Sequence, residues 1–279
     1  MTLPTFIGIG APRAGSTWLY QVLRSHPEIY MPHRRKEIMF FDHHFDRGLQ
    51  WYQGFFPKLA EAEHYRAIGE VSPWYMVHQE TAPRIQRTLN NCRLLVILRN
   101  PIDRTYSRYK NLVLEHGEKR SFSVFVREDQ RAVDVSCYDR HIEYFRRFFA
   151  ADRFKYIIFE RATRNPVRSL ATVADFLGLT HGFEQIGIRM FENPNPSQVT
   201  RFPRFYGSVR AASRFLRDHD YDFVVNIVKG WGIKRLSAGA QHFPFLDRDL
   251  RRELLVRHFA ESISRTEELI QEDLSEWRQ

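Results

Sequence analysis

The sequence predicts a three-layer α/β/α fold with a central, mostly parallel sheet and a helical C-terminal part. Short apolar runs alternate with helical stretches, as expected for strands joined by helical crossovers. The chain has 279 residues and 43% hydrophobic content, enough for one sizeable core. We therefore expect a single domain, with a main body over residues 1–180 and an extended loop and packing helices over 181–279.

The β-branched and apolar runs predict four strands, at 5–10, 67–71, 93–98 and 155–159. Apolar spacing and Pro, Asn and Gly boundary signals predict helices at about 16–25, 79–89, 101–115, 138–149 and 166–178. The polar, aromatic stretch 31–57 predicts a substrate-facing loop region with short helices. Later in the chain we expect a loop at 191–203 and helices near 208–217, 221–230 and 247–274.

The first strand runs into a glycine turn that resembles a phosphate-binding loop. Gly10 and Gly15 have the G-x-x-x-x-G spacing, but Ser16 stands where a nucleoside triphosphatase carries lysine, and the cation Arg13 lies inside the loop. Main-chain N–H groups at a helix start can hold a phosphate. The motif therefore predicts binding of a nucleotide phosphate without triphosphate hydrolysis.

A second motif follows the strand at 93–98. Arg99 stands where a magnesium-dependent P-loop enzyme usually presents an aspartate, and Asn100-Pro101 begins a helix that carries Ser107. A guanidinium at this position repels a divalent metal and attracts a second phosphate.

Together these motifs resemble the sulfotransferases that use 3′-phosphoadenosine 5′-phosphosulfate, PAPS. Gly10 to Leu19 is similar to their 5′-phosphosulfate loop, and Arg99 with Ser107 to their 3′-phosphate site. Three further segments resemble the heparan-type and bacterial members: Lys36 to Asp42 (K-E-x-x-F-F-D), Gly69 to Tyr75 (G-E-x-[ST]-P-x-Y) and Tyr138 to Leu179. The resemblance covers residues 5 to about 180, which it implies are a nucleotide-binding core with a P-loop-like fold.

The resemblance implies binding of PAPS and of its product 3′-phosphoadenosine 5′-phosphate, PAP. Arg13 would neutralise the leaving 5′-phosphate, and Ala14, Gly15, Ser16 and Thr17 would hold that phosphate. Arg99 and Ser107 would bind the 3′-phosphate. Trp18 and Tyr138 align with aromatic residues near the adenine, although core packing is the alternative for both. Arg201 and Arg204 lie in the later loop, where relatives fold basic residues over the cofactor, and Arg204 is included among the expected donor-binding residues.

Glu37 is the expected general base, by its place in the K-E-x-x-F-F-D segment. Phe40 and Phe41 nearby would partly desolvate it and favour proton uptake, whereas an ion pair within the basic patch of Arg34, Arg35 and Lys36 would hold it ionised. Lys36 would reach the transferring group or orient Glu37. His43 and His44 are the reserve candidates for the base.

The acceptor side is expected to involve Phe41, His43, Glu70 and Trp74. Glu70 ends a strand whose tip opens to the cleft in this class of sheet, so it could position the acceptor or the base. The aromatic residues of this region favour a small-molecule, lipid or glycan acceptor, although half or more of them could be core. They are Phe40, Phe41, Trp51, Tyr52, Phe55, Phe56, Trp74 and Tyr75.

Composition restricts the remaining function classes. The formal charge of +9 is the balance of 35 Arg and 7 Lys against 33 Asp and Glu. The basic residues form no block, which favours a solvated surface or a field that attracts an anionic nucleotide over nucleic-acid binding. Cys92 and Cys137 have no ligand spacing, so we expect neither disulfide nor metal. We expect no membrane span and a cytoplasmic protein of the soluble bacterial type, of undetermined oligomeric state.

Two other functions remain open at this point. A nucleotide or sugar kinase would share the strand, glycine loop and helix, but it should have Gly-Lys-Ser/Thr and a metal-binding aspartate. A non-catalytic nucleotide-binding module would keep Arg13 and Arg99 but would need no base.

Overall fold

The computed structural model describes residues 2–184 and 245–279, together with 199–200, 212–213, 215–218, 220–225, 238–239 and 243. The strands are β1 (Phe6–Gly10), β2 (Ile29–Tyr30), β3 (Ala67–Val71), β4 (Arg93–Leu98), β5 (Phe154–Ile158), β6 (Val199–Thr200) and β7 (Ala238–Gly239). The α-helices are α1 (Ser16–Ser25), α2 (Gly48–Gln53), α3 (Leu59–Ala62), α4 (Thr81–Thr88), α5 (Pro101–His116), α6 (Phe122–Glu128), α7 (Gln130–Asp134), α8 (Tyr138–Arg146), α9 (Phe159–Arg164), α10 (Pro166–Leu177), α14 (Arg248–Leu254) and α15 (Ala260–Ile270).

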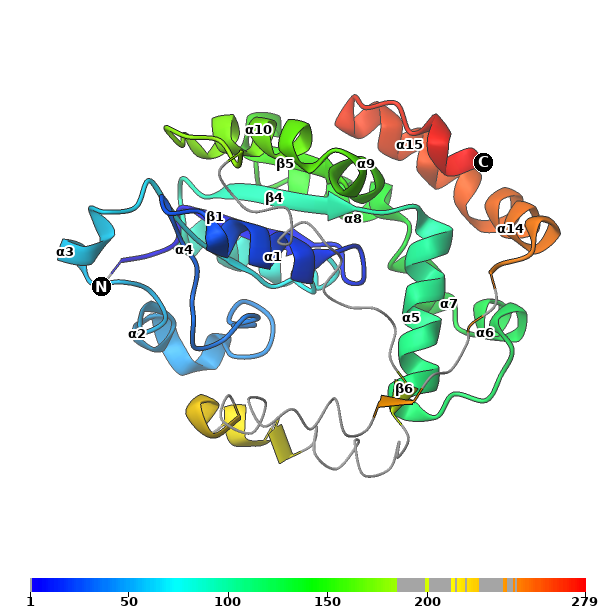
Figure 1. The fold of residues 1–279 in the computed structure, drawn as a ribbon, viewed down its shortest axis with the longest axis horizontal. Coiled ribbons are helices and arrows are strands. Elements are labelled where there is room, and N and C mark those ends of the chain that lie inside the picture. Colours follow the sequence, from blue (N-terminus) through cyan, green and yellow to red (C-terminus); the bar gives the residue numbers. More distant parts are fainter. Residues whose placement is uncertain are drawn as a thin grey trace.

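The centre of the fold is a five-stranded sheet with the order β2-β3-β1-β4-β5 (Figure 1). All of its strand pairs are parallel. β1 lies between β3 and β4, so the loop after β1 and the loop after β4 leave the same edge of the sheet side by side. This adjacency places the two predicted phosphate motifs together.

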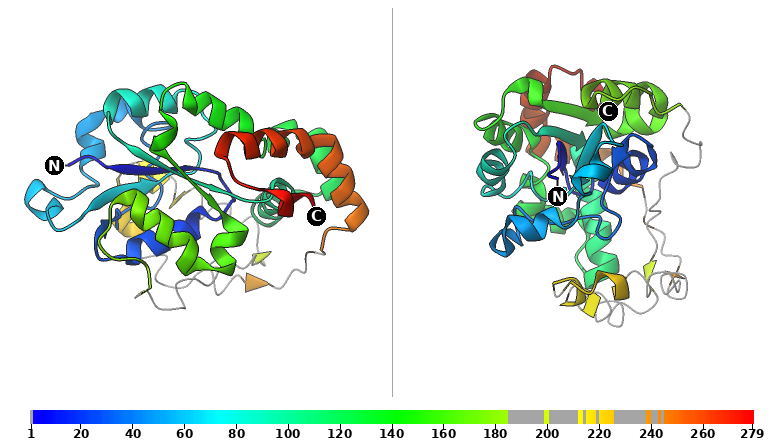
Figure 2. Two further views of the ribbon diagram at one scale, coloured as in Figure 1. Left: turned by 90° about the horizontal axis from the view of Figure 1, so that it is seen from above. Right: turned by 90° about the vertical axis from the view of Figure 1, so that its left-hand side faces the viewer.

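Helices cover both faces of the sheet, as the two further views show (Figure 2). Leu94, Val96 and Leu98 of β4 join a core with side chains of α4, α8 and α15. Leu95 and Ile97 of the same strand join the opposite core, with side chains of α1, α9 and α10. The alternation of one strand between two apolar cores explains why the run reads as continuously hydrophobic.

Local signals fix several helix ends. The Asn100 side chain accepts hydrogen bonds from the N–H groups of Ile102 and Asp103, and Pro101 takes the first helical position of α5. Asn165 and Pro166 begin α10 in the same way, and Gly178 ends it with a φ of 74°. These signals allowed the starts of α5 and α10 to be predicted from sequence.

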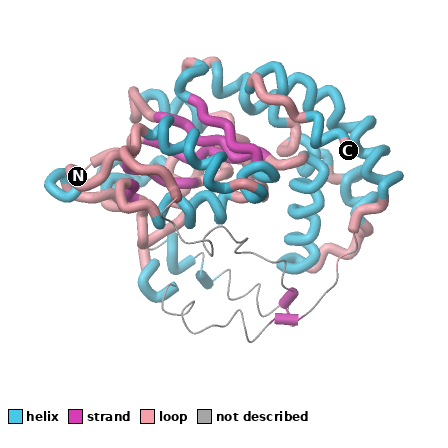
Figure 3. Tube along the Cα trace, turned by 45° about the horizontal axis from the view of Figure 1, so that its top comes forward, coloured by secondary structure: helices cyan, strands magenta, loops and turns pink. Residues whose placement is uncertain are grey.

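The expected α/β/α architecture is confirmed, with differences in detail (Figure 3). The sequence did not predict the two-residue strand β2 or the short helices α6, α7 and α9. The helix expected at 247–274 is α14 and α15 separated by a π-helical turn at Leu255–Phe259. The loop expected at 191–203 lies outside the described residues except for Val199 and Thr200 of β6. In the part that the structure describes, no helix combines the length and apolar character needed to cross a bilayer.

Candidate functional site

The turn between β1 and α1 leaves the start of the helix open to a ligand. Gly15 is the N-cap residue of α1, with a φ of 108°, and as a glycine it offers the helix no capping side chain. A Cβ on Gly15 would lie 2.3 Å from the Phe159 ring, so only glycine fits here. The N–H groups in the first turn of a helix are donors suited to a phosphate.

A buried arginine supports this turn from within the protein. Arg104 is 1% exposed. Its Nε donates to the Pro12 carbonyl at 2.9 Å, and its Nη1 donates to the Ala132 carbonyl and to Ser136 Oγ, each at 2.9 Å. Burial lowers the pKa of Arg104 to about 10, so it is cationic at neutral pH. Sequence reasoning assigned Arg104 no role, because only its tertiary contacts distinguish it from other arginines of α5.

Cations gather where the two motifs meet. Arg13 Nη2 lies 3.5 Å from the Ser107 carbonyl oxygen, which links the glycine turn to α5. The Arg99 guanidinium lies over the Phe159 ring, 5.1 Å from its centroid. Burial lowers the pKa of Lys110, and the positive charges of Arg99 and Arg13 lower it further. Arg13 therefore lies beside Ser107, and Lys110 of α5 lies close enough to Arg99 and Arg13 for their charges to lower its pKa. Sequence reasoning did not single out Lys110.

Lys36 connects the glycine turn to Glu37. Its Nζ donates to Thr17 Oγ1 at 2.8 Å and to Glu37 Oε1 at 2.9 Å. The side chains of Lys36 and Glu37 are 27% and 32% exposed. The predicted ion pair is present, and it places the partly exposed Glu37 carboxylate beside the phosphate turn.

Glu70 organises the backbone that carries Glu37. It is 0% exposed and accepts hydrogen bonds from Tyr52 Oη at 2.7 Å, Ser72 Oγ at 2.7 Å and Tyr75 Oη at 3.1 Å. Two of these hydroxyls in turn accept from the segment after Glu37: Tyr75 Oη from the Phe40 N–H at 2.8 Å and Ser72 Oγ from the Met39 N–H at 3.3 Å. Glu70 is thus a positioning residue for this segment.

Glu70 should make stability depend on pH. Burial raises its pKa to about 7, against the lowering effect of the three hydroxyl donors. Because the pKa of Glu70 is higher in the folded protein than in the unfolded chain, its contribution to the free energy of unfolding is fully present below about pH 4.5. This contribution is lost as the pH rises through about 7. We expect the wild type to lose up to about 3 kcal/mol of unfolding free energy relative to Glu70→Gln across this window. Urea unfolding of both proteins at several pH values measures the difference, and a difference that stays constant with pH would contradict this titration.

A buried ion-pair network joins the segment before Glu37 to the later part of the chain. Arg35 Nε lies 3.0 Å from Asp222 Oδ1, with side chains 3% and 1% exposed, and Arg34 Nε lies 3.1 Å from Asp222 Oδ2. Trp51 Nε1 donates to Asp220 Oδ1 at 3.1 Å. The Arg217 carbonyl accepts a hydrogen bond from Arg35. No sequence pattern indicated these pairs, because about 187 residues separate Arg35 from Asp222.

The two aromatic residues expected near the adenine are buried. Trp18 is 1% exposed and packs in the core between α1 and the sheet. Tyr138 is also 1% exposed, and its hydroxyl donates to the Arg99 carbonyl at 2.8 Å. The structure therefore favours the core alternative for Trp18 and gives Tyr138 the role of holding the backbone of Arg99. Adenine contact stays a prediction for both.

On the acceptor side, Phe41 and Glu70 are both 0% exposed. Contact of either side chain with an acceptor stays a prediction. His43 is exposed and Trp74 is half-buried, so these two remain candidates for contact. Six of the eight aromatic residues named for this region are buried, as the core alternative predicted. Arg201 and Arg204 lie outside the described residues.

Residues 3–195 match the family model described as the sulfotransferase domain. The chain is 30% identical over 184 residues to heparan sulfate glucosamine 3-O-sulfotransferase 6 of Mus musculus, an alignment that covers 63% of this chain and 52% of the mouse protein. It is 38% identical over 109 residues to the membrane-associated sulfotransferase kil1 of Dictyostelium discoideum, covering 39% of this chain and 23% of that protein. The chain thus spans about half or less of the length of these curated relatives.

Among solved structures, a sulfotransferase from Alicyclobacillus acidocaldarius superposes with a TM-score of 0.68 at 23% sequence identity. The match covers 100% of both chains. At this identity the likeness establishes the fold.

Proposed function

Because the chain belongs to the sulfotransferase domain family, we propose that it transfers a sulfuryl group from PAPS to a hydroxyl or amine of an acceptor, with Glu37 as the general base. The observation that carries this proposal is the meeting of the glycine turn before α1 with Arg13, Arg99 and Lys110 at one edge of the sheet. These groups suit a ligand with more than one phosphate.

The residues at this edge fit the two charged ends of PAPS. The first-turn N–H groups of α1 and the Arg13 guanidinium would hold the 5′ end. Arg99, Ser107 and Lys110 would hold the 3′-phosphate. When bound, PAPS supplies an activated sulfuryl group on a phosphosulfate linkage.

The chain's own residues then have separate tasks. Glu37 accepts the proton of the acceptor at a carboxylate oxygen. Lys36 and Arg13 stabilise negative charge beside the glycine turn, as fixed cations in a partly enclosed site. Arg13 cannot serve as the acid for the departing group because a guanidinium keeps its proton. Arg104 and Glu70 keep the turn and the Glu37 segment in place through their buried hydrogen bonds.

The acceptor is a small molecule, lipid or glycan that reaches Glu37 from the side of His43 and Trp74. The partial exposure of these two side chains supports this direction of approach. Similarity to proteins named as heparan sulfate glucosamine 3-O-sulfotransferases supports a hydroxyl of a glycan within this range. A panel of phenols, lipids and oligosaccharides with radiolabelled PAPS tests the range.

Selection of the 3′-phosphate gives the direct test. We expect PAP to bind more tightly than ADP in calorimetric titrations, and Arg99→Ala to lower PAP affinity by about 10- to 100-fold with little effect on ADP. The reason is that the guanidinium contacts only the phosphate that ADP lacks. Arg87→Ala, which removes an exposed arginine from α4, is the control and should bind both nucleotides like the wild type.

Two results would overturn the assignment. Equal affinity of the wild type for PAP and ADP would leave Arg99 and Ser107 without a 3′-phosphate to bind. An equal decrease in affinity for PAP and for ADP in Arg99→Ala would show that Arg99 supports the fold of the site and does not bind the 3′-phosphate.

A further inference from the structure

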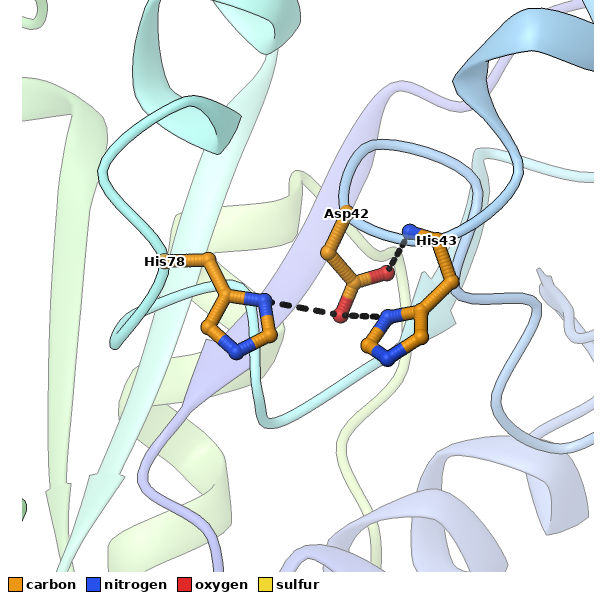
Figure 4. Close-up of side chains that lie close together, drawn as sticks. All are labelled: Asp42, His43 and His78. Atoms are coloured by element: carbon orange, nitrogen blue, oxygen red, sulfur yellow. Dashed lines mark hydrogen bonds and ion pairs between the residues drawn. The ribbon is translucent and has the colours of Figure 1, made fainter.

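Two histidines converge on one carboxylate oxygen beside the proposed acceptor side (Figure 4). Asp42 ends the segment that carries Glu37, His43 follows it, and His78 lies between β3 and α4. His43 Nδ1 lies 3.1 Å from Asp42 Oδ2, and His78 Nδ1 lies 3.5 Å from the same atom. One ligand atom from each of the three residues lies within 4.8 Å of the others.

The carboxylate is buried and incompletely paired. The Asp42 side chain is 0% exposed, and Oδ1 accepts a hydrogen bond from the His43 N–H at 2.8 Å. Oδ2 is a buried atom that accepts no hydrogen bond from the described residues, although both imidazoles face it. A buried carboxylate oxygen without a hydrogen bond is costly unless a cation neutralises it.

The spacing of the three atoms suits a metal ion between them. Zinc binds imidazole nitrogen and carboxylate oxygen at about 2.0–2.2 Å, so two ligands on a tetrahedral ion lie about 3.4 Å apart. The observed separations of 3.1 and 3.5 Å fall around this value, while neither contact has the geometry of a hydrogen bond. The ligand atoms of all three residues lie within 4.8 Å of one another.

The donor set and its surroundings select the class of ion. Two imidazoles and one carboxylate favour Zn²⁺ and its transition-metal neighbours over Mg²⁺ or Ca²⁺, which prefer oxygen ligands. The side chain of His43 is 51% exposed and that of His78 is 23% exposed, which leaves an entry path and open coordination positions.

We propose that Asp42, His43 and His78 form a binding site for a divalent transition-metal ion such as Zn²⁺. This site goes beyond the proposed sulfuryl transfer, which requires no metal, and it departs from the expectation drawn from the sequence.

Metal binding to the tag-free full chain tests the proposal. We expect one equivalent of Zn²⁺ in calorimetry, visible absorption bands on titration with Co²⁺, and a higher melting temperature with excess Zn²⁺, since a ligand that binds only the folded state stabilises it. His78→Gln should lower Zn²⁺ affinity by at least about 10-fold and abolish the thermal shift. His64→Gln, which changes an exposed histidine outside the cluster, should bind Zn²⁺ like the wild type.

Three outcomes would overturn the site: no saturable Zn²⁺ binding, equal binding by the wild type and His78→Gln, or an equal loss in His64→Gln. The Asp42→Asn variant is a second check, because it retains the shape of the side chain and removes the charge. PAP titration of His78→Gln separates this proposal from the proposed function. Normal PAP binding together with lost Zn²⁺ binding supports a metal site independent of the donor site.

Discussion

Replacing Glu37 by glutamine is expected to lower the rate of sulfuryl transfer by about 10²- to 10⁴-fold while leaving the affinity for PAP unchanged. Glutamine keeps the size of the side chain but cannot accept a proton at neutral pH. Lys36 can still donate to the amide oxygen and to Thr17, so the glycine turn keeps its contact with this segment. The rate is measured with radiolabelled PAPS on the best acceptor of the panel, and PAP affinity by calorimetry.

The matched control is Glu63→Gln, which changes an exposed carboxylate outside the site and should transfer at the wild-type rate. A parallel loss of PAP binding and turnover in Glu37→Gln would indicate a structural role. Full activity in this variant would exclude Glu37 as the base and direct attention to His43 and His44.

Removing the Arg104 side chain is expected to cost about 3 kcal/mol or more of unfolding free energy. Arg104→Ala leaves the Pro12 carbonyl, the Ala132 carbonyl and Ser136 Oγ without their buried donor, and it opens a cavity. The Pro12 carbonyl belongs to the glycine turn, so we also expect weaker PAP binding. Urea unfolding gives the stability, and calorimetry gives the affinity.

Two further variants test whether the loss of stability comes from the buried hydrogen bonds of Arg104. Arg104→Lys keeps the charge but not the planar fork, and it should recover only part of the lost stability. Arg131→Ala removes an exposed arginine from the neighbouring helix α7 and should change stability by no more than about 0.5 kcal/mol. Equal stability of Arg104→Ala and Arg131→Ala would contradict a supporting role for Arg104.

The parts of the fold that could be predicted are those with local causes. The bounds of β3, β4 and α1 match the expected ranges because β-branched runs, Gly15 and His26-Pro27 act over a few residues. β2 was missed because it has two residues and depends on its pairing with β3. The π-helical turn at Leu255–Phe259 was missed because the apolar spacing continues through it.

The candidate site likewise has features that the sequence predicts and features that depend on tertiary contacts. Arg13, Arg99 and Ser107 could be expected together because parallel neighbouring strands end at one edge. The burial of Glu70 could not be predicted, because its three hydroxyl partners come from α2 and from the turn after β3. The burial of Trp18 likewise depends on α10 and the sheet, which contribute to its core.

The pairing of Arg35 with Asp222 has a consequence for exchanging parts between related enzymes. Arg35 lies within the matched residues 3–195, whereas Asp222 lies beyond them. A chimaera that keeps Arg35 and loses Asp222 would leave the buried guanidinium without its charged partner, and breaking a buried ion pair typically costs several kcal/mol. The segment that carries Arg35 and the segment that carries Asp222 should therefore be exchanged together. A C-terminal portion from a relative is compatible only if it supplies a carboxylate that pairs with the buried Arg35.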